Sequence, residues 1–179
     1  MTLAAPMRDG ELRIEPAVEA HREPLRAACA QDEQIWEIYP IRFFAEDFDR
    51  NFDEMLDSSV NLAFVLLEGD CIVGTSSFLA VNRTSWSLEI GRTYIVPSVR
   101  GTGLNRRIKK LMLDRAFGEG FVRVTFKVDT RNTRSMAAVR KLGATHEGTL
   151  RKDRITWTGY VRDTAIFSIL ADEWAELRA

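Results

Sequence analysis

The sequence predicts an α/β (α+β) fold in which helices flank one mixed, mostly antiparallel sheet. The first half of the chain carries strand-like apolar runs joined by tight-turn residues. The second half alternates strand, helix, strand and helix before a last hairpin, an order that makes the sheet mixed. With 179 residues, 45% of them hydrophobic, the chain suits one compact domain, and we expect residues 1–179 to form it.

The first elements are a strand and two helices. The run ELRIEP predicts a strand over residues 11–16, and Pro16 suits the first turn of a helix that continues to residue 30. A second helix is predicted over residues 45–56. Between the helices, IWEIYP is predicted to be a loop with apolar side chains, because Pro40 disfavours helix at the preceding residue.

Two hairpins and a long alternating strand are predicted next. Apolar runs on both sides of the turn EGD at residues 68–70 form the first hairpin. Residues 86–96 then alternate, which places one set of side chains on a core face: Trp86, Leu88, Ile90, Tyr94 and Val96. A closing hairpin is predicted from residues 144–155 and 164–170, with its turn at Thr158-Gly159.

Two helices alternate with a strand in the second half. Apolar residues recur at helical spacing from Leu104 to Met112, so a helix is predicted there, with a basic run, Arg106, Arg107, Lys109 and Lys110, largely on its solvated face. The run FVRVTFKV predicts a strand, with Val122, Val124, Phe126 and Val128 on one side. Asn132 is predicted to cap a shorter helix that Gly143 ends.

Composition narrows the function classes. The net charge of −1 gives no overall field that would attract nucleic acid or an anionic membrane, so we expect neither as a partner. The N-terminus lacks the apolar run of a signal peptide, and no apolar stretch approaches the ~20 residues that span a bilayer. The two cysteines do not follow metal-ligand spacing. We therefore expect a soluble, cytoplasmic protein with reduced thiols.

The segment VRGTGLN suggests an anion-binding turn between a strand and a helix. A helix N-terminus offers unpaired N–H groups and about half a positive charge, and Gly101 and Gly103 let a phosphate approach the backbone. The phosphate-loop pattern G-x-x-x-x-G-K-[ST] does not occur in the chain. A dinucleotide fingerprint would need a third glycine where Arg106 stands.

The turn instead resembles that of the GNAT superfamily of acyl-CoA-dependent N-acetyltransferases, with Asn105 where glycine or alanine is usual. Three segments occur in the order of the branch that includes the ribosomal-protein N-terminal-alanine acetyltransferases: VPSVRGTGLNRRIKKLMLDRAF, NTRSMAAVRKLGATHEGTLR and RDTAIFSIL. The resemblance covers residues 12–174 and implies a GNAT-like sheet of about seven strands. It also implies acetyl-CoA, or another acyl-CoA, as co-substrate, bound by Tyr94, Ile95, Val96, Arg100, Gly101, Thr102, Gly103, Leu104, Asn105, Asn132 and Ser135.

Transfer from a thioester to an amine needs a neutral nucleophile, stabilisation of the oxyanion and a proton for the thiolate. Glu89 is the candidate general base, because strand alternation places it on the less apolar face and the family often carries its base there. The alternative is a structural carboxylate paired with an arginine. The family's usual acid is a tyrosine, and its position here is Val139. Ser135, one turn earlier, could serve the thiolate or only complete the cap made by Asn132.

The acceptor side of the site is less defined by the sequence. The resemblance places the loop with Trp36 and Tyr39 over the amine, and Trp157 could form the opposite wall, although core packing is the safer interpretation for these rings. His21 and His146 lie on unrelated elements, so we expect no metal. The arginines from 131 to 140 are expected to be solvated rather than to bind RNA, and one could meet a coenzyme phosphate.

These observations favour an acyl-CoA N-acyltransferase that acetylates a primary amine, such as a protein or peptide N-terminus, by direct attack. The alternative from another class is a non-catalytic acyl-CoA sensor or interaction protein, which the valine at position 139 would suit. A nucleic-acid-binding protein that uses residues 100–110 is a second alternative. Pairing of the last strands between subunits would give a homodimer, which we favour.

Overall fold

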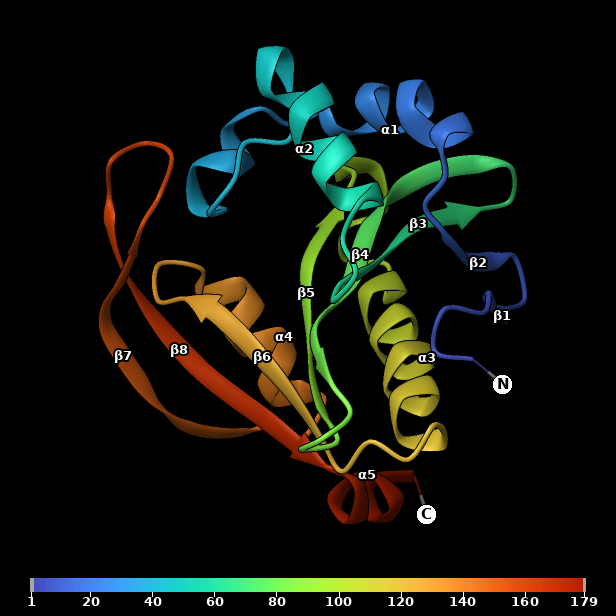
Figure 1. Ribbon diagram of the computed structural model, residues 1–179, viewed down its shortest axis with the longest axis vertical. Helices are drawn as coiled ribbons and strands as arrows, with labels where there is room; N and C mark the ends of the chain where they lie inside the picture. Colours follow the sequence, from blue (N-terminus) through green and yellow to red (C-terminus); the bar gives the residue numbers. More distant parts are fainter. Residues whose placement is uncertain (1, 179) are drawn as a thin grey trace.

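An open sheet of eight strands runs through the computed structural model, which describes residues 2–178 (Figure 1). The strands are β1 (Met7–Asp9), β2 (Leu12–Pro16), β3 (Leu62–Glu68), β4 (Cys71–Asn82), β5 (Ser87–Ile95), β6 (Arg123–Asp129), β7 (Thr145–Ile155) and β8 (Val161–Leu170). They lie in the order β1-β2-β3-β4-β5-β6-β8-β7, and only β5 and β6 are parallel. The mixed, mostly antiparallel sheet is thus confirmed. Its eighth strand is β1, whose three residues are too few for a clear sequence pattern.

Helices cover the sheet in two groups. The α-helices are α1 (Arg22–Cys29), α2 (Phe48–Leu56), α3 (Leu104–Gly118), α4 (Thr133–Lys141) and α5 (Ala171–Arg178), with 3₁₀ turns η1 (Glu19–His21), η2 (Gln34–Ile38), η3 (Ala45–Asp47) and η4 (Pro97–Val99). In Figure 1, α1 and α2 lie together across the upper ends of the strands, whereas α3 runs alongside β5 and α4 beside β6. The segments that surround the β5–β6 junction therefore come from all parts of the chain.

The prediction that Pro16 starts the first helix is wrong. Pro16 is the last residue of β2 and pairs with Phe64 of β3. The helix begins only after the η1 turn, at Arg22. A proline at the end of a strand loses no essential ladder hydrogen bond, so it fits this position as well as a helix start.

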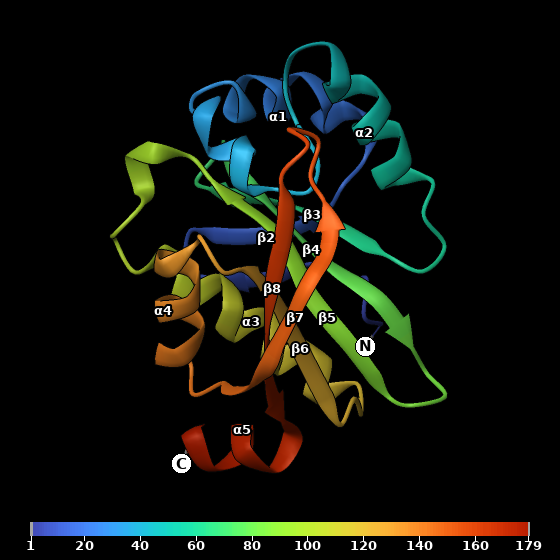
Figure 2. The ribbon, with the colours of Figure 1, turned by 90° about the vertical axis from the view of Figure 1, so that its left-hand side faces the viewer.

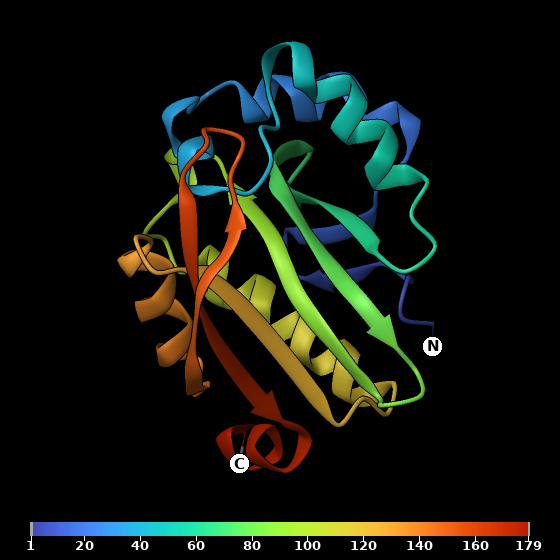
Figure 3. The ribbon, with the colours of Figure 1, turned by 60° about the vertical axis from the view of Figure 1, so that its left-hand side comes forward.

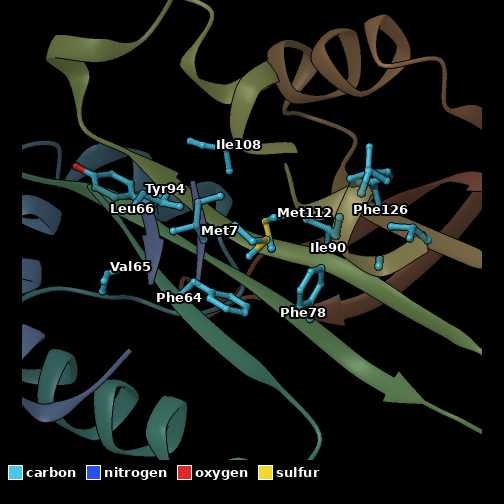
Figure 4. Packing of buried hydrophobic residues seen from close by; sticks show 14 of the residues in the cluster. Met7, Phe64, Val65, Leu66, Phe78, Ile90, Tyr94, Ile108, Met112 and Phe126 are labelled. Carbon is cyan, nitrogen blue, oxygen red and sulfur yellow. The ribbon is translucent and has the colours of Figure 1, made fainter. Parts of the chain in front are cut away.

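The apolar core extends from α3 across the middle strands to α1 and α2. Ile108 and Met112 of α3 are fully buried, as are Phe64 and Phe78 of β3 and β4 (Figure 4). Each such side chain contributes about 1.5–3 kcal/mol by leaving water. Two residues predicted for a core face lie outside it, since Trp86 and Val122 are 41% and 54% exposed. Both residues precede the strands to which they were assigned.

A β-bulge interrupts β5 halfway along its length. Thr75 pairs with Tyr94 and Ser77 with Gly91, so one residue of β4 faces two of β5, Arg92 and Thr93. Arg92 adopts φ +49°, a conformation that few side chains tolerate. The strict alternation predicted for residues 86–96 therefore breaks at this point, because a bulge shifts which side chain faces which layer.

β5 and β6 pair over only three residues of each strand. Ser87 to Glu89 pair with Arg123 to Thr125, and beyond these residues the strands diverge (Figure 3). All other long strands continue pairing along their length. The two halves of the sheet are thus joined at one end and open at the other.

The β7–β8 hairpin reaches from the edge of the sheet toward the η2 segment (Figure 2). At its tip the indole N–H of Trp157 donates to the Trp36 carbonyl oxygen over 2.8 Å. This bond joins the last hairpin to the loop between α1 and α2. β7 is an edge strand, and pairing of the last strands between two subunits stays a prediction.

Among residues 2–178, no helix is long and apolar enough to cross a bilayer.

The close approach of β4 and β5 at Gly74 gives a test of this architecture. A Cβ atom at Gly74 would lie 2.0 Å from the Tyr94 carbonyl oxygen, so Gly74→Ala should force the strands apart. We expect urea denaturation to show a loss of roughly 1–3 kcal/mol or more in the free energy of unfolding. Gly118→Ala is the control, because a Cβ there meets nothing within 4 Å and the helix should gain up to about 1 kcal/mol. Equal stability of the two variants would contradict the observed strand spacing.

Candidate functional site

A cavity of about 1010 Å³ lies where β5 and β6 part. Its walls come from β5 and β6, the N-terminal turn of α3, one face of α4, and the loop that follows α1. Nine basic and two acidic side chains line it: Arg92, Arg100, Arg106, Lys109, Lys127, Arg134, Lys141, Arg154 and Arg162, with Glu89 and Asp129. The cavity is therefore strongly electropositive although the whole chain is nearly neutral.

Unpaired backbone N–H groups gather at the α3 end of the cavity. From Gly101 to Asn105 no main-chain N–H has an acceptor among residues 2–178, whereas the N–H groups of Arg106 and Arg107 both donate to the Gly103 carbonyl oxygen. Gly101 and Gly103 have φ values of +83° and +88°, and a Cβ at either position would meet nothing within 4 Å. The turn therefore leaves open space in front of a row of donors at a helix N-terminus, which suits a diphosphate.

The side chains of this turn hold it in place and leave its N–H groups free. Arg100 Nε donates to the Ile95 carbonyl oxygen over 2.7 Å, and its guanidinium is ion-paired with Asp32. The Thr102 hydroxyl donates to the Val99 carbonyl oxygen, and the Leu104 side chain is buried in the core. Arg100 thus ties the end of β5 to the segment after α1, so its side chain acts on the shape of the turn.

Four further side chains at this end are available to a ligand. Arg106, Arg134 and Lys141 line the cavity, and none of them forms an ion pair with another described residue. Asn105 also lines it, and its Oδ1 atom is buried without a hydrogen-bond partner among residues 2–178. The three cations can meet phosphate groups, while the amide oxygen can accept from a donor on the bound molecule.

The open edge of β5 forms one wall of the cavity. Val96 N–H donates to the Val73 carbonyl oxygen on the β4 side, so strand alternation turns the main-chain groups of Ile95 toward the cavity. The Thr93 carbonyl oxygen accepts from the Tyr39 hydroxyl over 2.5 Å. Tyr94 and Ile95 line the cavity, whereas the Val96 side chain is buried outside it.

Glu89 lies at the closed end of the cavity, where β5 and β6 still pair. Its carboxylate is 15% exposed, and Oε2 lies 3.3 Å from Lys127 Nζ. The predicted structural partner was an arginine; the structure places this lysine of β6 there instead. Glu89 faces the cavity, so its carboxylate is both positioned by an ion pair and accessible to a small reactant.

α4 presents its first turn to the opposite wall. The predicted cap is confirmed, because Asn132 Oδ1 accepts from the Ser135 main-chain N–H over 3.0 Å. The Ser135 hydroxyl makes no hydrogen bond with any described residue and lines the cavity together with Val139. The cap therefore uses the backbone of Ser135 and leaves its hydroxyl free.

The aromatic residues of the η2 segment form a roof over the cavity. Trp36 is 2% exposed and stacks on Tyr94, with ring centroids 4.8 Å apart, and Tyr39 lies against Trp36. Burial raises the pKa of the Tyr39 hydroxyl to about 12. Trp36 and Tyr39 line the cavity, but Trp157 does not. Its indole N–H donates to the Trp36 carbonyl oxygen, and its ring lies near Arg42.

The prediction that Lys109 belongs to a solvated helix face is wrong. Lys109 is 5% exposed and donates to the Thr93 hydroxyl, with the Ser76 hydroxyl 3.5 Å away. These two hydroxyls are themselves hydrogen-bonded, and all three groups lie beside the β5 bulge. The buried residues of α3 form two rows. One row is Leu104, Ile108 and Met112, and the other is Lys109, Leu113 and Ala116. This second row was the sequence signal that could have identified it.

Arg92 and Arg162 also escaped the sequence analysis. Both line the cavity near Glu89, and no short motif marks either residue. Arg92 reaches the cavity because it occupies the bulge, and Arg162 because its strand, β8, pairs with β6 in the sheet. Only the three-dimensional pairing of the strands brings these residues together.

Among the described residues, no group of three or more histidine, cysteine, aspartate or glutamate side chains is placed to hold a metal ion.

Three solved structures that share this fold are described as acetyltransferases. A probable GNAT-family acetyltransferase from Chromobacterium violaceum has 28% identity and a TM-score of 0.89, covering 96% of this chain and 89% of that chain. The spermidine N-acetyltransferase of Vibrio cholerae, solved with CoA and spermine, has 15% identity and a TM-score of 0.78, covering 93% and 99%. The ribosomal-protein-S5-alanine acetyltransferase of Vibrio fischeri has 18% identity and a TM-score of 0.78, covering 94% and 98%.

The fold and the site thus define an acyltransferase architecture. The chain belongs to the GNAT family, because residues 11–145 match the acetyltransferase (GNAT) domain. This membership makes it an acyl-CoA-dependent N-acetyltransferase. No curated protein sequence matches the chain.

The buried amine of Lys109 predicts a distinct pH dependence of stability. Burial lowers its pKa to about 7, whereas in the unfolded chain it titrates near ~10.4. Between these values the unfolded state binds a proton that the native state does not, so rising pH favours the native state. Relative to Lys109→Met, the wild-type free energy of unfolding should rise from about pH 7 to about pH 10 and stay level below pH 7.

Urea denaturation of both proteins across this range measures the difference. Lys110→Met is the control, because Lys110 is exposed and pairs with Asp114 on the same helix. Parallel stability curves for wild type and Lys109→Met would show that Lys109 has an ordinary pKa.

Proposed function

We propose that the protein transfers an acetyl group from acetyl-CoA to a primary amine by direct attack of the amine. The row of unpaired N–H groups from Gly101 to Asn105 carries this proposal, because it opens into the cavity that also contains Glu89. A donor row, a strand edge and a carboxylate in one cavity match the three parts of the reaction: anchoring the carrier, aligning its arm and removing a proton.

The cofactor end of the cavity would hold coenzyme A. The N–H groups of the turn would bind the diphosphate, and Arg106, Arg134 and Lys141 would meet its phosphate oxygens. The free main-chain groups near Ile95 would align the pantetheine arm along β5. When bound, acetyl-CoA supplies the activated thioester; the chain supplies its position.

Proton transfer falls to Glu89 and Ser135. The Glu89 carboxylate accepts a proton from the amine, directly or through a water molecule, and Lys127 holds that carboxylate in place. The free hydroxyl of Ser135 lies on the first turn of α4 and can donate to the departing sulfur. Val139 supplies no proton, so Ser135 takes the place of the tyrosine that other family members use.

Neither cysteine suits an acyl-enzyme route. Cys29 is fully buried, and burial raises the pKa of its thiol, which disfavours the nucleophilic thiolate. Cys71 is exposed at the start of β4 and does not line the cavity. This distribution supports direct attack by the amine.

Two measurements with the whole chain test the proposal. Acetyl-CoA should raise the melting temperature in a concentration-dependent way, as any ligand that binds the native state does. In the presence of a panel of primary amines, free thiol should then be released from acetyl-CoA. Stabilisation without thiol release from any panel member would favour a sensor, and no stabilisation would refute binding at the turn.

Glu89→Gln should lower kcat/KM for amine acetylation by about 10²-fold or more, since general bases typically contribute ~10²–10⁴-fold. The effect should be larger for alkyl amines, with pKa near ~10.4, than for α-amines, with pKa near ~7.7–8.0. Thiol release measured from pH 6.5 to about pH 9 tests this expectation. Glu11→Gln, in an exposed turn, is the control and should match wild type. A Glu89→Gln profile that coincides with wild type would exclude the base role.

A further inference from the structure

Two arginines, the buried Arg162 and the half-buried Arg92, stand in the part of the cavity opposite the glycine turn. Arg92 lies in the β5 bulge and Arg162 near the start of β8, and both line the cavity with Glu89. The reaction described above uses neither of them. Both guanidinium groups interact electrostatically with Glu89 and with Arg154, so the four side chains lie near one another.

Arg162 lacks the partners that a buried guanidinium needs. It is 4% exposed, its Nε is buried, and it makes no hydrogen bond with any residue from 2 to 178. Its ion-pair partner is Asp129, whose Oδ2 lies 3.9 Å from Nε. That carboxylate is already committed, because Arg131 donates to Oδ1 from its main-chain N–H and Nε and to Oδ2 from its Nη2.

Arg92 is also without a partner. It forms no hydrogen bond and no ion pair of 4.0 Å or less with the described residues. Burial lowers the pKa of its guanidinium, as it does for Arg162. Arg92 has φ +49°, a strained backbone conformation, yet its side chain forms no ion pair or hydrogen bond with the described residues that would offset the strain. Such strain is typical of functional positions.

The local carboxylates balance these charges only in part: Glu54 and Glu89 act on Arg92 without forming an ion pair with it, and Arg162 shares Asp129 with Arg131. Glu89 is ion-paired with Lys127, and Asp153, outside the cavity, is paired with Arg154. A guanidinium stays charged in proteins, so desolvating two of them with only one long ion pair between them and the carboxylates is costly. The imbalance is relieved when a ligand brings an anion, and a planar carboxylate fits the planar guanidinium fork.

We propose that Arg92 and Arg162 form a subsite for a carboxylate carried by one of the two reactants, so that the enzyme selects acidic substrates. The proposal rests on the acetyl-transfer function above and names the substrate class of that site. The acceptor amine is the first source, as in a free amino acid or a short peptide acid. The acyl group is the second source, as in a dicarboxylic acyl-CoA. The proposal predicts that polyamines are poor acceptors, because the arginines would repel their cationic ends.

Matched substrates separate the two sources in the wild-type enzyme. Dipeptide acids and their carboxamides differ in a carboxylate that is remote from the amine, and spermidine serves as the cationic amine. Acetyl-CoA is the donor in this arm. In the second arm succinyl-CoA is compared with butyryl-CoA, which has an acyl chain of equal length without the charge. Thiol release gives kcat/KM, and we expect a preference of about 10-fold or more for the acid in one arm, as a charged hydrogen bond would give.

Variants test whether the arginines cause the preference. Arg92→Met and Arg162→Met should lower the acid-to-neutral ratio of kcat/KM about 10-fold, and Arg162→Lys should keep part of it. The ratio is taken on one enzyme sample, so partial unfolding of a variant does not change it. Arg151→Met, on the exposed face of β7, is the matched control and should retain the wild-type ratio.

Different results would contradict the carboxylate subsite and the acetyl-transfer function. Equal kcat/KM for acid and neutral members in both arms, or an unchanged ratio in Arg92→Met and Arg162→Met, overturns the carboxylate subsite and leaves acetyl transfer standing. An absence of any thermal stabilisation by acetyl-CoA overturns the proposed function and the subsite with it.

Discussion

The parting of β5 from β6 is the constraint on which the rest of the structure depends. Three residues of each strand pair, and then the two edges separate. An unpaired strand edge inside a protein leaves backbone groups without partners, which costs free energy unless something else satisfies them. Here the Arg100 and Tyr39 side chains satisfy two carbonyl oxygens of β5, and the remaining edge is free for an extended ligand. The cavity therefore follows from the way in which the sheet is joined.

The bulge in β5 explains how this opening is kept in shape. One residue of β4 faces two of β5, which increases local twist and turns the strand away from its neighbour. Lys109 supports the bulge from below through the Thr93 and Ser76 hydroxyls. A buried amine at this position costs free energy, because desolvation opposes its charge. An apolar residue would fill the space at a lower cost in free energy. Its fixed bonding geometry offers what an apolar residue does not, a defined position for the strand that borders the reaction site.

The features predictable from the sequence are those determined by neighbours in the chain. The glycine turn, the Asn132 cap and the hairpin turns each depend on a few consecutive residues, so the sequence signals matched the structure. The bulge depends on how β5 pairs with β4, and it decides that Arg92 faces the cavity. Lys109 looked solvated within a basic run because its burial depends on the sheet beneath it. The positions of Arg92 and Arg162 required the fold, whereas the helical spacing of Lys109 with Leu113 and Ala116 could have indicated its burial.

Positive charge without a close partner in the chain occurs at both ends of the cavity. At the α3 end, backbone N–H groups and unpaired cations face the region where the carrier's phosphates would lie, so that positive charge has a counter-ion in the co-substrate. The same logic applies at the other end, where Arg92 has no ion pair with a described residue and Arg162 has one long pair, with an Asp129 carboxylate that Arg131 also binds. Glu89 lies at this same end, near the two arginines, and its single negative charge is shared with Lys127. An amine that carries a carboxylate would place its cationic nitrogen toward Glu89 and its acid toward the arginines, so both charges would be paired in one orientation.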